Sequence, residues 1–88
     1  ISLEKVLPAL RRAAPEAEMV ALFKPQFEVG RTEVGKGGIV RDPLAIEAAM
    51  KRFRDWSAGH GYAFKEEAAS ELAGAEGNRE IFVHLMPQ

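Results

Sequence analysis

The feature that most constrains this chain is the apolar run Met19–Phe23, which ends abruptly at Lys24 and Pro25. Five consecutive apolar residues are too few for a typical helix and show no polar alternation, which predicts a strand buried on both faces. Pro25 cannot donate to a sheet ladder, and it favours an extended conformation for the residue before it. Lys24 is therefore expected at the carboxyl end of a buried strand, the edge where open α/β sheets bind ligands.

Amphipathic helices are predicted before and after this strand. The first is capped by Ser2 and closed by Pro15, and its apolar residues follow the helical period. Pro8 lies beyond the first turn of this helix, which predicts a kink or a late start. The second helix begins at Asp42, with proline as its first helical residue, and ends at Gly59.

Residues 26–41 separate the strand from the second helix, and they contain four glycines and no regular period. This composition predicts a long loop. The segment Gly30–Gly37 approaches a phosphate-binding P-loop in sequence. However, glycine follows Lys36 where serine or threonine would reach magnesium, and no helix is expected there, so nucleotide hydrolysis is not predicted.

Two further strands are predicted at Tyr62–Ala68 and Glu80–Met86, with a small-residue loop over 70–78. A helical crossover makes the first two strands parallel, whereas the short last connection makes the third strand antiparallel. Apolar residues on both faces of the third strand favour a central position. The prediction is an α/β fold with a three-stranded sheet, and this topology brings Glu80 to the same edge as Lys24.

Lys24 and Glu80 each have an ordinary interpretation as solvated residues at a strand end. Convergence of the two at one sheet edge, beside glycine-rich loops, favours a functional site instead. No metal site is predicted, because His60 and His84 are far apart and have no cluster of acidic partners.

Composition limits the classes of protein that this chain can represent. Its 88 residues suffice for one small hydrophobic core. A net charge of −1 provides no basic field, so any RNA contact must be local or supplied from elsewhere. The absence of cysteine excludes disulfides and thiolate zinc sites and fits a cytoplasmic location, and no apolar run approaches the length of a membrane span.

Three segments resemble one family in order and spacing: Phe23–Glu28 (FKPQFE), Gly35–Pro43 (GKGGIVRDP) and Gly74–Glu80 (GAEGNRE). They are similar to the TlyA (haemolysin A) branch of the FtsJ-like ribosomal RNA ribose 2′-O-methyltransferases, and the resemblance extends to the opening residues. One departure is Glu71 after Ser70, where the family often has proline.

The resemblance implies a Lys-Asp-Lys-Glu catalytic tetrad, S-adenosylmethionine as methyl donor and ribosomal RNA as acceptor. Lys24 matches the second lysine and Glu80 the glutamate; the lysine would deprotonate or orient the ribose hydroxyl while the glutamate holds it in place. Gln26, Phe27 and Asn78 are further candidates for the substrate pocket. The first lysine, the aspartate and the glycine-rich cofactor turn have no match here, so residues 1–88 are interpreted as the carboxyl half of a Rossmann-like methyltransferase domain.

Three expectations follow from this interpretation. The chain begins with Ile1, which indicates a processed product or a fragment, and such a fragment should be inactive alone. The strand Met19–Phe23 should leave an edge open, so a homodimer through that edge is expected. A non-catalytic RNA-binding module and a membrane-active haemolysin are the alternatives, but no helix combines a strong basic face with a broad apolar face.

Overall fold

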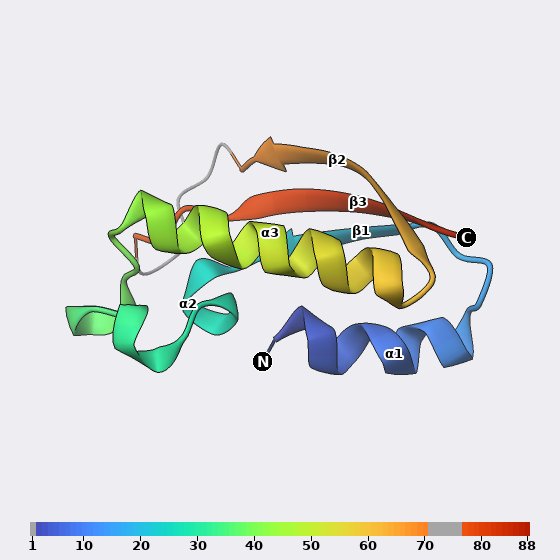
Figure 1. The fold of residues 1–88 in the computed structure, drawn as a ribbon, viewed down its shortest axis with the longest axis horizontal. Helices are drawn as coiled ribbons and strands as arrows, with labels where there is room; N and C mark the ends of the chain where they lie inside the picture. The colour runs from blue at the N-terminus through green and yellow to red at the C-terminus, as the bar shows by residue number, and fades with distance from the viewer. Residues whose placement is uncertain (1, 71–76) are drawn as a thin grey trace.

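One three-stranded sheet organises the chain, of which the computed structural model describes residues 2–70 and 77–88. The strands are β1 (Met19–Phe23), β2 (Tyr62–Ala69) and β3 (Ile81–Pro87), in the order β1-β3-β2. Because β3 is antiparallel to both neighbours, β1 and β2 run parallel to each other (Figure 1). The predicted topology, with the last strand antiparallel and central, is confirmed.

Two long helices flank the sheet, α1 (Leu3–Ala13) and α3 (Pro43–Gly59). The Ser2 hydroxyl accepts a hydrogen bond from the Glu4 amide and caps α1, which runs on through Pro8. The expected late start of this helix is therefore wrong. At the start of α3 the Asp42 carboxylate accepts a bond of 2.9 Å from the Leu44 amide, as the Asp-Pro signature predicts.

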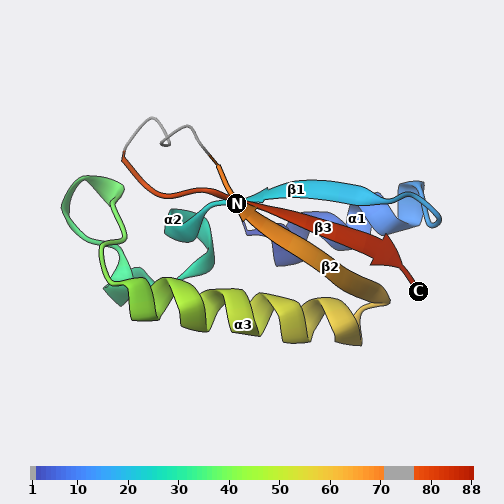
Figure 2. The ribbon, with the colours of Figure 1, turned by 90° about the horizontal axis from the view of Figure 1, so that it is seen from above.

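Both helices pack against the same face of the sheet. Figure 2 shows the sheet from above, with α1 passing behind it and α3 along its side. The hydrophobic core lies between this face and the two helices. It contains one residue of α1, three of α3 and four of the sheet: Leu7; Ala49, Met50 and Phe53; and Phe23, Tyr62, Val83 and Leu85.

The reverse face of the sheet is open among the described residues. The side chains of Val20 and Phe82 are 69% and 44% exposed, and only Phe23 of β1 is fully buried. The prediction that Met19–Phe23 is buried on both faces is therefore wrong for this chain. The physical reason is that α1 and α3 contribute to one core on one face, so Val20 has no helix above it.

The segment after β1 is more regular than expected. It contains the single-turn helix α2 (Pro25–Glu28) and two 3₁₀ turns, Arg31–Glu33 and Lys36–Gly38. The prediction of one long irregular loop is wrong, because a single turn is too short to produce a period in the sequence. A 3₁₀ turn rather than an α-helix follows Gly35, in line with the expectation that no P-loop helix begins there.

One end of the molecule gathers the carboxyl end of β1, the start of β3, α2 and the start of α3 (Figures 1 and 2). Of the loop predicted over 70–78, residues 71–76 lie outside the described part of the chain.

Candidate active site

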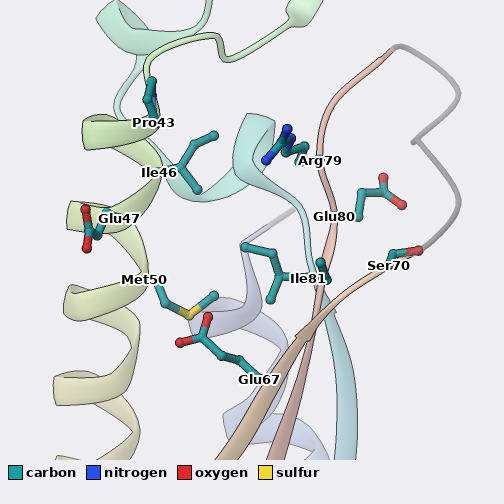
Figure 3. A pocket seen from close by; sticks show the side chains of 10 residues that line it. Pro43, Ile46, Glu47, Met50, Glu67, Ser70, Arg79, Glu80 and Ile81 are labelled. Carbon is teal, nitrogen blue, oxygen red and sulfur yellow. The ribbon is translucent and has the colours of Figure 1, made fainter.

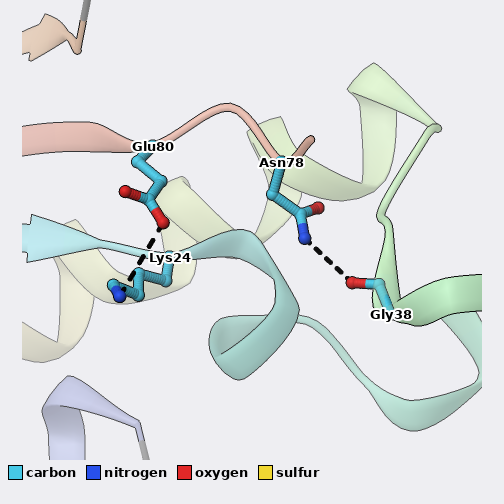
Figure 4. A network of polar contacts seen from close by, with 4 residues as sticks. All are labelled: Lys24, Gly38, Asn78 and Glu80. Carbon is cyan, nitrogen blue, oxygen red and sulfur yellow. Dashed lines mark hydrogen bonds and ion pairs between the residues drawn. The ribbon is translucent and has the colours of Figure 1, made fainter. Parts of the chain in front are cut away.

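Lys24 and Glu80 meet at the end of the sheet. Phe23, the last residue of β1, pairs with Ile81, the first residue of β3; Lys24 directly follows Phe23 and Glu80 directly precedes Ile81. The Lys24 Nζ atom lies 3.8 Å from Oε2 of Glu80 (Figure 4). The adjacency inferred from the lengths of the connections is confirmed.

This ion pair contributes little to the stability of the fold. A separation of 3.8 Å exceeds hydrogen-bond length, and a partly exposed pair of this kind contributes little to folding. The Glu80 side chain is 12% exposed while that of Lys24 is 40% exposed, so the carboxylate is held and the ammonium is open to an incoming group. The backbone of Glu80 is fixed by a bond of 2.9 Å from the Ser70 amide.

The turn that follows Lys24 places two predicted substrate residues beside it. The Phe27 ring centroid lies 6.0 Å from Lys24 Nζ, and the phenylalanine is 48% exposed. The Gln26 Oε1 atom is buried and makes no hydrogen bond within the described part of the chain. A buried acceptor without a partner is costly.

Asn78 is fully committed to the backbone of the glycine-rich segment. Its Oδ1 accepts from the Val40 amide and its Nδ2 donates to the Gly38 carbonyl, both at 2.8 Å; Figure 4 shows the second bond. The residue is 1% exposed. Asn78 is preceded by Gly77, whose φ of +86° only glycine adopts readily. Asn78 can therefore shape a pocket only by holding residues 38–40 against the start of β3.

A groove of about 480 Å³ lies beside Glu80, between α3 and the ends of β2 and β3. Figure 3 shows Ile46, Met50 and Ile81 facing one another across it, with Arg79 at its upper end. Sequence reasoning missed this groove and the role of Arg79 in lining it. The available signal was the apolar face of α3 extending to Ile46 at its first turn, close to the end where Glu80 was expected.

The described residues lack the patterns typical of metal sites and of membrane spans. No group of three or more His, Asp or Glu side chains that could hold a metal ion occurs in residues 2–70 and 77–88. Across the same residues, every helix is too short or too polar to cross a membrane. Among residues 2–70 and 77–88, no strand is followed by the G-x-G-x-x-G turn that holds S-adenosylmethionine in such folds, so the described residues do not by themselves fit that cofactor.

Comparison with known proteins identifies the family to which this site belongs. Residues 1–86 match the FtsJ-like methyltransferase family. The chain belongs to that family. Its relatives include YqxC of Bacillus subtilis, 46% identical over 86 residues that make up 97% of this chain. The 16S/23S rRNA (cytidine-2′-O)-methyltransferase TlyA of Mycobacterium tuberculosis is 43% identical and matches 100% of the chain.

A solved structure supports the same assignment for this FtsJ-like chain. A Lactococcus lactis protein described as a hemolysin superposes with a TM-score of 0.92 at 37% identity, covering 100% of this chain and 42% of that one. The chain spans 31% of YqxC and 33% of TlyA, about a third of the length of these relatives. The roles of the five candidate site residues remain predictions. These residues are Lys24, Glu80, Gln26, Phe27 and Asn78.

Proposed function

We propose that residues 1–88 are the carboxyl half of the methyltransferase domain of a ribosomal RNA ribose 2′-O-methyltransferase. The observation that carries the proposal is the Lys24–Glu80 pair at the open end of the sheet, in a chain 43% identical to an rRNA (cytidine-2′-O)-methyltransferase. Ribosomal RNA, in a cytoplasmic ribosomal subunit or precursor, is the proposed partner.

In this proposal Lys24 acts on the ribose 2′-hydroxyl, a poor nucleophile at neutral pH. Its exposed Nζ either orients the oxygen toward the methyl group as an ammonium or, as the neutral amine, accepts the hydroxyl proton, and Glu80 fixes the lysine. Lys24 and Glu80 would be the second lysine and the glutamate of a Lys-Asp-Lys-Glu tetrad. Gln26 and Phe27, in the turn that follows Lys24, would contact the acceptor nucleotide, and Asn78 holds the backbone of residues 38–40.

The methyl group would come from S-adenosylmethionine, which supplies an electrophilic methyl carbon. Its binding turn and the remaining two tetrad residues would be provided by a part of the domain outside residues 1–88. The 88-residue chain alone is therefore proposed to be inactive and not to bind the donor. β1 forms an edge of the sheet among the described residues, so pairing of two copies along β1 is proposed for the isolated chain.

Methylation of ribosomal subunits by the complete protein tests the function. Purified protein, S-adenosylmethionine and unmodified subunits should yield a 2′-O-methylated nucleoside, identified by mass spectrometry after nuclease digestion. RNA binding without methyl transfer would instead favour a non-catalytic module. Leakage of dye from liposomes, with no methylated product, would favour the membrane-active haemolysin suggested by the name of the Brachyspira hyodysenteriae relative, Hemolysin A.

A further inference from the structure

Glu28 makes a double contact that none of the roles above uses. Its Oε1 accepts a hydrogen bond of 2.7 Å from the Ser2 hydroxyl, and its Oε2 accepts one of 2.9 Å from the Leu3 amide. Both carboxylate oxygens of a residue in α2 are thus engaged by the start of α1. We infer that Glu28 is a positioning residue for Lys24, an inference that rests on the proposed function.

The chemistry of a helix start makes this contact specific. The first amides of α1 have no acceptor within the helix and carry partial positive charge, which a carboxylate satisfies and stabilises. Ser2 completes the arrangement, because its hydroxyl donates to Glu28 while accepting from the Glu4 amide at 3.3 Å. Glu28 thereby fastens the end of α2 to a long helix that is anchored in the core by the fully buried Leu7.

The contact reaches Lys24 because α2 is too short to hold its own shape. A single helical turn is unstable alone. This one is closed by two backbone bonds, from the Phe27 amide to the Lys24 carbonyl at 2.9 Å and from the Val29 amide to the Pro25 carbonyl at 3.0 Å. Lys24 is the N-cap residue of this turn. The sheet fixes the turn at its first end and Glu28 fixes it at its last, so the direction of the Lys24 side chain depends on both.

Three variants of the complete enzyme test this role: Glu28→Ala, Glu28→Gln and, as a matched control, Glu33→Ala, which removes an exposed carboxylate from the same segment. A displacement of about 1 Å at a reacting group can cost about 100-fold in rate. Glu28→Ala should therefore lower kcat by about 10- to 100-fold with the dissociation constant for S-adenosylmethionine unchanged. Glu28→Gln keeps one acceptor oxygen, so its kcat should lie between those of Glu28→Ala and the wild type. The kcat of Glu33→Ala should equal that of the wild type.

A readout independent of activity separates this inference from the proposed function. Hydrogen exchange at the Phe27 and Val29 amides should accelerate in Glu28→Ala and in Ser2→Ala, but not in Glu33→Ala. Unchanged exchange in Glu28→Ala would overturn the positioning role whatever the enzyme's activity. Wild-type kcat in Glu28→Ala, or an equal loss of kcat and donor affinity, would also overturn it. A wild-type enzyme that transfers no methyl group would refute the proposed function and leave the exchange experiment to decide the role of Glu28.

Discussion

Among single residues, Asn78 offers the clearest link between a side chain and the geometry of the site. It joins the Val40 amide and the Gly38 carbonyl to the loop that enters β3, and Val40 is itself buried. Asn78→Ala should lower the free energy of unfolding by about 1–3 kcal/mol, the cost of leaving a buried amide without an acceptor. Denaturant unfolding would measure the loss. Arg79→Ala, at the exposed neighbouring position, is the control and should change stability by less than about 0.5 kcal/mol; equal stabilities of the two variants would contradict the account of Asn78.

Glu80 provides a second prediction at this scale, on catalysis by the complete enzyme. Glu80→Gln keeps an oxygen that can accept from Lys24 and loses only the charge, so it should retain more activity than Glu80→Ala. Both variants should bind S-adenosylmethionine as the wild type does, because the donor-binding turn is proposed to lie outside residues 1–88. Initial rates at saturating RNA measure the difference. Equal inactivity of the two variants would mean that the charge itself, rather than a held lysine, is needed.

The adjacency of Lys24 and Glu80 could be predicted from the sequence, whereas the two hydrogen bonds that Asn78 makes to the backbone of residues 38–40 could not. The first depends on strand direction and order, which connection lengths and apolar pattern determine. The second depends on the path of residues 38–40, where Gly38 has a φ of +78°. A glycine permits that conformation without requiring it, so no sequence pattern specifies which backbone groups Asn78 would meet.

At the scale of elements, the strongest sequence signals produced the most accurate predictions. The apolar helical period that follows Asp42 and the alternation of Ile81, Val83 and Leu85 each repeat a physical requirement several times, and α3 and β3 follow them. The single turn α2 offers no repeat and was missed. The open face at Val20 was missed for a different reason, since an apolar run shows that a strand suits burial but not which elements cover it.

The N-cap of α3 gives a prediction for an element. The Asp42 carboxylate satisfies the Leu44 amide, so Asp42→Ala should destabilise the chain by about 1 kcal/mol, within the usual range of about 0.5–2 kcal/mol. A thermal unfolding scan would detect the lower midpoint. Arg52→Ala, an exposed change within the same helix between residues of similar helix propensity, should leave the midpoint nearly unchanged. A midpoint as high in Asp42→Ala as in Arg52→Ala would show that the cap does not stabilise α3.

For the molecule as a whole, the open edge and face of β1 predict self-association of the 88-residue chain. The sheet order leaves β1 with one neighbour among the described residues, and Val20 is 69% exposed on it. An uncovered edge of this kind recruits another strand, and two-fold pairing is the commonest closed arrangement. Size-exclusion chromatography with light scattering should show a dimer that Val20→Lys weakens by placing a charge on the strand. A monomer at high concentration would contradict the proposed pairing.

The central claim is that this chain carries a catalytic lysine for ribose methylation, and single-turnover methyl transfer by Lys24→Ala in the complete enzyme tests it most directly. The reaction would use unmodified ribosomal subunits, saturating S-adenosylmethionine and Lys65→Ala as control, because Lys65 is an exposed lysine on β2 away from the site. Lys24→Ala should slow the transfer by about 10²- to 10⁴-fold, as loss of a general base does, with donor binding intact and the control at the wild-type rate. A wild-type rate in Lys24→Ala would rule out a catalytic role for Lys24.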